Sequence, residues 1–403
     1  MYKHNIEEAI ANPVRNVVLW FPYFSKIHLL KDPGQIPVYL SRMGYNVRIL
    51  TYDDERNKNL SAADKVELVK LQKHGKLLQL VDIPLLCYVL KNRKNIGCMI
   101  LYFANLRTTA LLVILKLLNA KTLYIVKMDS DGRLYDNRAF KNRVFKLNLT
   151  RKVFRRIVGE ITFRVLPFTA NLMSIESPEA RQRVLNIYPW LEHKLVVLPN
   201  GINRHWFDEM SRTVQADDDK TILFVGRVEH IKGPDLLIRA FSRLKDKYPD
   251  WKLELVGEII PSFRAEMEHL ISENLKDRVV LTGPLYGRDL VQKYMSASIF
   301  CLPSRIESFG IALVEAMYFN NAVISAETGA ARYMLDYGDA GMIFDAGDID
   351  QLTACLDRLI GDEILRKRLA TAAKLRCEKL FDWESIMSQL DHHIFNMSKG
   401  VFV

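Results

Sequence analysis

Residues 221–241, TILFVGRVEHIKGPDLLIRAF, decide the fold of this chain of 403 residues. The apolar run TILFV leads into a loop, and Pro234 and Asp235 then open an amphipathic helix. A continuous apolar run is typical of a strand that is buried on both faces of a parallel sheet. The stretch therefore predicts a strand, a loop and a helix, the repeating element of an α/β protein.

The same alternation recurs along the chain. In the first half, apolar runs stand at residues 17–21, 47–50, 77–82, 99–103 and 122–128. In the second half they stand at residues 221–226, 252–257, 279–283, 299–303 and 322–325. This order predicts two doubly wound domains. Pro199, Asn200 and Gly201 interrupt the pattern, so we expect the second domain to begin near residue 201.

The composition is that of a globular protein, with 49% hydrophobic and 26% charged residues, which excludes a disordered or fibrous chain. The five cysteines are an odd number without a CxxC pair, so we expect reduced core thiols at Cys87, Cys98, Cys301, Cys355 and Cys377. No apolar run serves as a signal peptide or reaches the roughly 20 residues of a membrane span. We therefore expect a cytoplasmic protein.

The net charge of +10 is unevenly distributed. Residues 1–200 hold 32 Lys and Arg against 16 Asp and Glu, whereas residues 201–403 hold 25 against 31. Clustered cations attract anionic partners, so the first half fits an anionic membrane surface, a phosphorylated acceptor or a nucleic acid. The alternative is that the charge only keeps the protein soluble.

Two cations lie in the loop that follows the strand at 221–226. Arg227 and Lys232 stand between Gly226 and Gly233, just before the predicted helix. Ligands of open α/β sheets bind outside the carboxyl ends of the strands, and an Arg fork beside a Lys point charge suits a pyrophosphate. A solvated basic loop is the alternative.

A second motif, PSRIESFGIALVEAM at 303–317, is more specific. Glu307 stands in a loop and Glu315 on the first turns of a predicted helix, so both can face one ligand. The backbone amides around Gly310 and Ile311 lie at the start of that helix, where the dipole favours a phosphate. An acidic helix start explains a single Glu but does not explain the whole motif.

Taken together, these two motifs resemble the signature of retaining glycosyltransferase family four and its GT-B relatives. The resemblance covers essentially the whole chain, more faintly in the first half. It implies that Arg227 and Lys232 bind the pyrophosphate of a nucleotide-sugar donor and that Glu307 contacts hydroxyl groups of the donor sugar. It also implies that Glu315 binds the ribose and that the backbone of Phe309, Gly310 and Ile311 holds phosphate.

The resemblance also implies the architecture and the reaction. The expected fold is GT-B, with two Rossmann-like domains that face a central cleft. Residues 1–200 would bind the acceptor and would be completed by a C-terminal helix at 384–403, and residues 201–383 would bind the donor. The activity implied is that of a hexosyltransferase that retains the anomeric configuration by same-face attack, needs no cofactor and uses a nucleoside-diphosphate sugar as donor.

The first half departs from the family pattern at two places. In the family a Gly-Gly loop lets the backbone approach the donor phosphates and the acceptor. Here only Gly34 is present as our candidate for this contact, before a predicted helix at Gln35–Met43 that Gly44 would cap. Where relatives carry a His, this chain reads KMDSDG, and Asp129 is our candidate for that role, since carboxylates stabilise oxocarbenium-like centres. Alternatively, Asp129 or Asp131 caps the next helix or binds a metal. We expect no metal site, because Arg227 and Lys232 already supply positive charge.

Residues 138–164 hold nine Lys or Arg and a single acid, Glu160. Phe140, Val144, Leu147, Phe154 and Val158 recur near helical spacing opposite this basic face. Such a helix can lie at a membrane interface, which suggests contact with the inner membrane leaflet and a lipid-linked or cell-surface glycan acceptor. An ordinary helix whose apolar side faces the sheet is the alternative.

Two other classes of function are compatible with this architecture. One is a non-catalytic scaffold that binds membrane or nucleic acid through its basic half, and the other is a nucleotide-sugar epimerase. We expect no nucleic-acid partner, because no stretch interleaves basic residues with the aromatic side chains that stack on bases. The presence of both Glu307 and Glu315 favours an enzyme.

Overall fold

The computed structural model describes residues 15–61, 65–72, 82–118, 121–130, 149–212, 219–271 and 275–400, with the side chains of 149–156 and 219 excepted. By its internal contacts the chain divides into two compact units. Unit 1 comprises residues 1–200 and 383–403, and unit 2 comprises residues 201–382. These limits differ by one residue at most from the domain break expected above.

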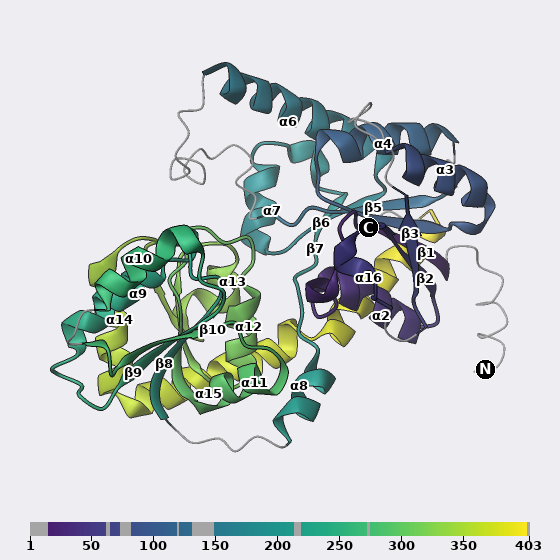
Figure 1. Ribbon diagram of the computed structural model, residues 1–403. Helices are drawn as coiled ribbons and strands as arrows, with labels where there is room; N and C mark the ends of the chain where they lie inside the picture. Colours follow the sequence, from purple (N-terminus) through teal and green to yellow (C-terminus); the bar gives the residue numbers. More distant parts are fainter. Residues whose placement is uncertain are drawn as a thin grey trace. The chain divides into compact units, whose positions relative to one another are not determined.

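The described residues of unit 1 form a seven-stranded parallel sheet in the order β3-β2-β1-β4-β5-β6-β7 (Figure 1). The strands are β1 (Asn16–Trp20), β2 (Asn46–Tyr52), β3 (Glu67–Leu71), β4 (Cys98–Tyr102), β5 (Leu123–Lys127), β6 (Leu172–Ile175) and β7 (Leu195–Val197). The helices are α2 (Asp32–Arg42), α3 (Ile83–Asn92), α4 (Leu106–Leu118), α6 (Leu149–Thr169), α7 (Pro178–Leu185) and α16 (Trp383–Ser398).

Alternate residues of these strands enter two different cores, as expected of a sheet that is covered on both faces. Val18 and Leu101 pack with α3, α4, α6 and α7 in one core. Val17 and Ile100 pack with α2 and α16 in the other. Unit 1 is therefore doubly wound, as the sequence predicts.

Unit 2 repeats this design with a six-stranded parallel sheet of described residues in the order β10-β9-β8-β11-β12-β13. Its strands are β8 (Asp219–Val225), β9 (Lys252–Val256), β10 (Val279–Gly283), β11 (Ala297–Leu302), β12 (Ala322–Ala326) and β13 (Met342–Phe344). Its helices are α8 (Arg204–Ser211), α9 (Pro234–Leu244), α10 (Pro261–Leu270), α11 (Gly287–Ser296), α12 (Ile311–Tyr318), α13 (Ala331–Met334), α14 (Ile349–Gly361) and α15 (Glu363–Leu380). Phe224 and Cys301 point into one core, and Leu223 and Phe300 into the other.

The C-terminal helix belongs to unit 1, as the resemblance implies. The bend between α15 and α16 is held within unit 2, where Ile202 N–H donates to the Phe381 carbonyl at 2.8 Å. Beyond the bend, α16 packs against α2 and β5 of unit 1. Its buried residues recur three or four positions apart and form one apolar face: Trp383, Ile386, Met387, Leu390, Ile394 and Met397.

Two local expectations are corrected by the structure, and a third cannot be compared with it. Residues 77–81 of the strand expected at 77–82 lie outside the described residues, and the edge strand of the described sheet is β3, about ten residues earlier. The helix expected from Gln35 begins at Asp32, because Pro33 is compatible with the first turn. Cys87 is exposed rather than in the core, since it lies on α3 opposite the buried Leu85 and Val89.

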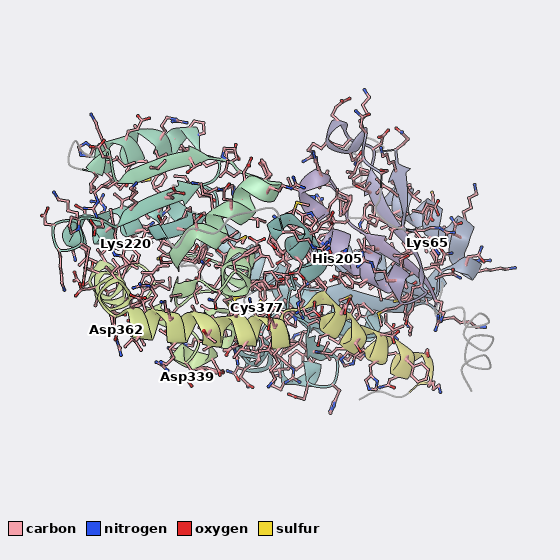
Figure 2. All side chains as sticks on the ribbon, turned by 90° about the horizontal axis from the view of Figure 1, so that it is seen from below. Lys65, His205, Lys220, Asp339, Asp362 and Cys377 are labelled. Atoms are coloured by element: carbon pink, nitrogen blue, oxygen red, sulfur yellow. The ribbon has the colours of Figure 1, made fainter. Side chains whose placement is uncertain are left out.

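The other four cysteines are buried and, like Cys87, free. Figure 2 shows Cys377 on α15, the helix that Asp362 caps at its start by accepting a hydrogen bond from the Leu365 amide. The Cys377 thiol lies 3.5 Å from the Val314 carbonyl of α12. These four thiols are therefore packing groups of the cores.

Candidate functional site

The two motifs of unit 2 meet at one point of its sheet. From β8 the chain continues through α9 to β9 on one side, and from β11 it continues through α12 to β12 on the other side. β8 and β11 are neighbours, so the strand order reverses between them. Such a switch point, at the carboxyl ends of the strands, is where open α/β sheets bind their ligands.

Lys232 and Glu307 form an ion pair across this switch point. The Lys232 Nζ lies 3.0 Å from Glu307 Oε1 and 2.6 Å from Oε2. Their side chains are 22% and 12% exposed, so the pair is shielded but reachable from solvent. The tertiary structure thus brings together two predicted site residues that are 75 positions apart.

Arg227 lies in the same loop and is held more loosely. Its Nη2 lies 2.8 Å from Glu229 Oε1, and 59% of its side chain is exposed. A solvated guanidinium keeps its planar set of donors available, which suits an anionic ligand. The β8 loop therefore offers one shielded and one exposed cation.

Backbone geometry supplies further donors at the β11 loop. Gly310 has φ +104 and precedes α12, where it makes no side-chain cap because it has no side chain. The first N–H groups of a helix lack partners within the helix, so the amides of Ile311 and Ala312 can face an anion, whereas Leu313 N–H donates to the Gly310 carbonyl at 2.9 Å. The Phe309 ring is buried and meets Phe381 edge-on, which leaves its backbone as the part able to face a ligand.

Glu315 is held from the interior of unit 2. The buried Tyr294 hydroxyl donates to Glu315 Oε2 at 2.7 Å. Burial, together with the charge of Glu315, raises the pKa of Tyr294 well above its usual range, so the hydroxyl remains a donor. The Glu315 carboxylate therefore keeps one fixed partner in the protein.

One residue of this site was missed at the sequence level. Arg305 makes two hydrogen bonds to the Asp235 carboxylate, at 2.8 and 2.6 Å, and one to the His230 carbonyl at 2.6 Å. It thereby ties the β11 loop, which carries Glu307, to the β8 loop, which carries Lys232. Its place two residues before Glu307 marks it as part of the motif, but nothing local points to a partner 70 residues away.

In unit 1, Gly34 lies in the first turn of α2 beneath its own preceding loop. A Cβ at this position would meet the His28 carbonyl oxygen at 2.5 Å and the Leu29 backbone at 2.6 Å. The buried Gly34 therefore serves the close packing of residues 26–31 on the helix. This contact explains why a glycine is required there whether or not a ligand approaches.

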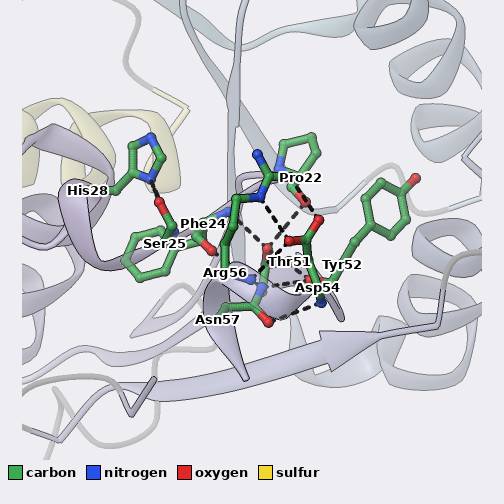
Figure 3. A network of polar contacts seen from close by, with 9 residues as sticks. All are labelled: Pro22, Phe24, Ser25, His28, Thr51, Tyr52, Asp54, Arg56 and Asn57. Atoms are coloured by element: carbon green, nitrogen blue, oxygen red, sulfur yellow. Dashed lines mark hydrogen bonds and ion pairs between the residues drawn. The ribbon is translucent and has the colours of Figure 1, made fainter. Parts of the chain in front are cut away.

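The loop that follows β1 is braced by a polar network (Figure 3). Phe24 N–H donates to Thr51 Oγ1 at 3.0 Å, and the buried Asn57 amide donates to the Tyr52 carbonyl at 2.8 Å and the Phe24 carbonyl at 3.3 Å. Arg56 pairs with Asp54 through two hydrogen bonds and lies over the Tyr23 ring. The loops after β1 and β2 are thus joined at the carboxyl edge of the unit 1 sheet.

Asp129 directly follows β5 and lies in a charged cluster. It has φ +45, a left-handed conformation that few non-glycine residues adopt. Lys127 Nζ lies 3.6 Å from Asp32 Oδ2 and 3.5 Å from Glu176 Oε1. Asn200 Nδ2 donates to the same Glu176 oxygen at 2.9 Å. Asp131, the second acid of KMDSDG, lies outside the described residues.

Burial controls the protonation of this cluster. It raises the pKa of Glu176 to about 8, an effect that Lys127 opposes and that Asp129 and Asp32 reinforce. Burial also raises the pKa of Asp32. It lowers the pKa of Lys127, but the charges of Asp32, Glu176 and Asp129 outweigh this and raise that pKa overall. The ammonium is therefore retained, while a carboxyl group holds a proton near neutral pH.

Most of the basic segment 138–164 cannot be compared with the structure, because residues 131–148 and the side chains of 149–156 lie outside the described part. In the described part of α6, Thr162, Phe163 and Leu166 are buried against unit 1. Ile157, Ile161 and Phe168 are 52%, 46% and 83% exposed. Apolar side chains therefore point outward as well as inward on this helix.

Comparison with known proteins finds a matching family for the part of the chain that carries these motifs. Residues 207–376 match the family described as glycosyl transferases group 1. An uncharacterized glycosyltransferase of Methanocaldococcus jannaschii is 28% identical over 224 residues, which are 53% of this chain and 57% of that protein. A D-inositol 3-phosphate glycosyltransferase of Pseudarthrobacter chlorophenolicus is 24% identical over 263 residues, 61% of this chain and 62% of the relative. The chain thus matches about 60% of the length of these curated relatives.

Solved structures share the whole fold. Sucrose-phosphate synthase from Thermosynechococcus elongatus aligns with a TM-score of 0.73 at 19% identity, covering 96% of this chain and 99% of its own. Anabaena HepE in complex with UDP aligns with a TM-score of 0.72 at 17% identity, and the alignment covers 94% of this chain and 100% of the HepE chain. The chain has the GT-B fold of these structures, and its residues 207–376 match the family of glycosyl transferases group 1.

Proposed function

We propose that the chain is a retaining, metal-independent hexosyltransferase that moves a sugar from a nucleoside-diphosphate sugar to an acceptor near a membrane. The observation that carries the proposal is the Lys232–Glu307 pair at the switch point between β8 and β11, beside the start of α12 at Ile311. Cations, amides and a carboxylate at one sheet edge suit a ligand that is anionic at one end and rich in hydroxyl groups at the other.

The roles follow from the chemistry of each group. Lys232 and Arg227 would neutralise the pyrophosphate, and the backbone amides around Gly310 and Ile311 would donate hydrogen bonds to it. Glu307 would then turn from Lys232 to hydroxyl groups of the donor sugar, and Glu315, steadied by Tyr294, would accept hydrogen bonds from the ribose. HepE, a structural neighbour, was solved with UDP, which supports a nucleoside diphosphate as ligand in this fold.

Metal independence is proposed because fixed positive charge is already present where a leaving diphosphate would develop its charge. Retention is proposed from the family resemblance, with same-face attack assisted by the departing phosphate and no protein nucleophile. The product anomer, determined by NMR, and full activity in the presence of a chelator would test these two points.

The acceptor is proposed to lie near a membrane, on the inner leaflet. No helix in the described part of the chain is both long and apolar enough to span a bilayer. The support for surface contact is the outward row of Ile157, Ile161 and Phe168 on α6, next to a segment rich in Lys and Arg. Apolar side chains with flanking cations are typical of interfacial helices.

A thermal-shift screen against UDP, GDP, ADP, CMP and dTDP tests the donor site, since a ligand that binds the native state alone raises its melting temperature. We expect one nucleoside diphosphate to shift the wild type, and the shift to vanish in Arg227→Ala and Glu315→Ala. Arg239→Ala, which removes a half-exposed cation of α9, is the matched control and should keep the shift. No shift with any nucleotide would favour a non-catalytic scaffold.

Co-sedimentation with vesicles of anionic lipid tests the membrane contact. The double change Ile161→Ser and Phe168→Ser should reduce binding. The fourfold change Arg151→Glu, Lys152→Glu, Arg155→Glu and Arg156→Glu should also reduce it. Ile364→Ser, an exposed apolar residue of α15 in unit 2, serves as the control. Binding that neither set of changes reduces would refute a role for this segment.

A further inference from the structure

The charged cluster beneath Asp129 is buried more deeply than a solvated ion network would be. Lys127 is 4% and Glu176 1% exposed, and the Asp32 side chain is 15% exposed. The groups come from separate elements: Lys127 ends β5, Glu176 follows β6, and Asp32 begins α2. The fold therefore holds these charged groups almost entirely away from solvent.

The charges of the cluster do not balance. Three carboxyl groups, those of Asp32, Asp129 and Glu176, face one ammonium group, Lys127. Two uncompensated negative charges in a buried site are costly, and neighbouring carboxylates avoid this by sharing a proton. The other polar groups that face the cluster are Tyr102, at the end of β4, and Asn200.

The hydrogen bonds indicate where the proton lies. Glu176 Oε1 accepts from Asn200, whereas Oε2 is buried and accepts no hydrogen bond from any described residue. The Asp129 carboxyl group lies close enough to Glu176 for a hydrogen bond between the two. Two carboxyl groups can make such a bond only when one of them carries the proton. A proton on Glu176 Oε2 would make this bond, and it would account for the lack of a described donor to that oxygen.

We propose that Glu176 is a positioning residue, which holds a proton and donates it in a hydrogen bond to Asp129, so that the Asp129 carboxyl group is kept oriented just after β5. The inference rests on the proposed function, with Asp129 in the role suggested by the sequence, the stabilisation of an oxocarbenium-like centre. The single ammonium of Lys127 offsets one of the carboxylate charges that remain. The hydrogen bond also explains how Asp129 keeps its left-handed backbone, since a fixed side chain offsets that cost.

Loss of the Glu176 proton has a defined effect. Ionised Glu176 can no longer donate, and it places a second negative charge beside Asp129. Both changes release Asp129 from its orientation, so transfer should fall as pH rises through the pKa of about 8. Glutamine at position 176 has the same shape and still donates through its amide, but it cannot ionise.

Infrared difference spectra of the full-length protein test the shared proton without any substrate. The wild type at pH 7 should show the carbonyl stretch of a protonated carboxyl group that is absent in Glu176→Gln and disappears at high pH. Asp129→Asn should shift this band, because the acceptor of its hydrogen bond changes. Glu192→Gln, an exposed position of unit 1, should leave the band unchanged. Absence of the band in the wild type would overturn the proposal.

Transfer kinetics, with the nucleotide sugar whose nucleotide stabilises the wild type, test the positioning role. Glu176→Gln should keep kcat within about twofold at pH 7 and lose the alkaline decline. Glu176→Leu, which cannot donate, should lower kcat about tenfold with little change in the donor KM. If both variants keep the pH profile and the kcat of the wild type, the positioning role of Glu176 is refuted. If the wild type transfers no sugar at all, the proposed function fails, while the spectra still decide whether Glu176 and Asp129 share the proton.

Discussion

Arg305→Met should lower the unfolding free energy of unit 2 far more than Arg243→Met, which breaks an exposed ion pair. The Arg305 and Asp235 side chains are 17% and 5% exposed, so methionine would leave a buried carboxylate without this partner and would remove one of the donors to the His230 carbonyl. Breaking a buried pair from one side costs about 3–5 kcal/mol. In the pair Arg243–Asp350 the side chains are 51% and 87% exposed, and such pairs contribute about 0.2–1 kcal/mol.

Urea unfolding of Arg305→Met and Arg243→Met measures this difference. The transition of unit 2 must be separated from that of unit 1, because two units need not unfold together. Hydrogen exchange of peptides from β8 and α9 makes that assignment. Equal losses of unfolding free energy in the two variants would refute the argument that burial decides the cost.

A double variant separates the pair from its surroundings. Asp235→Asn in the Arg305→Met background removes the orphaned charge, so it should recover part of the lost unfolding free energy. If the losses of the single variants simply add, the two side chains are not coupled. Because Arg305 joins the loops of Lys232 and Glu307, the same variant should also weaken the nucleotide-induced thermal shift.

Three further outcomes follow from the geometry. Burial raises the pKa of Glu176 to about 8 in the folded chain, so the folded chain binds this proton more tightly than the unfolded chain does. The unfolding free energy of the wild type should therefore fall as pH rises from about 4.5 to 8. Calorimetry should find a weaker fall in Glu176→Gln. Gly233→Ala should lower the melting temperature and nucleotide affinity, because Gly233 has φ +70 and a Cβ there would lie 2.1 Å from the Pro303 carbonyl oxygen. Tyr294→Phe should weaken nucleotide binding about tenfold by calorimetric titration, because Glu315 loses its fixed donor.

Each of these outcomes has a contrary result. A pH dependence of stability that is identical in wild type and Glu176→Gln would place the titration elsewhere. Gly347→Ala controls for the left-handed backbone alone, since Gly347 has φ +92 and no atom near its Cβ position; a loss equal to that of Gly233→Ala would remove the steric argument. Unchanged nucleotide affinity in Tyr294→Phe would mean that Glu315 needs no support from α11.

The sequence predicts much of the fold because its signals are local. Apolar runs of strand length and amphipathic helices with Gly and Pro at their ends are read within about 20 residues, and they recover the two doubly wound units and α16. The edge strand β3 is not predicted from the sequence, because its residues Glu67–Leu71 are at most partly buried and do not form a continuous apolar run. Cys87 was misplaced for a related reason, since the face of α3 decides its exposure.

The candidate site divides in the same way. The sequence by itself determined which residue types stand after β8 and β11, and so the class of ligand that we propose, because a strand end, a loop and a helix start are contiguous in the chain. Only the tertiary structure decided that Lys232 meets Glu307, that Arg305 meets Asp235, and that Glu176 reaches Asp129. Those pairings join segments up to 75 residues apart, and they depend on strand order, which no local pattern specifies.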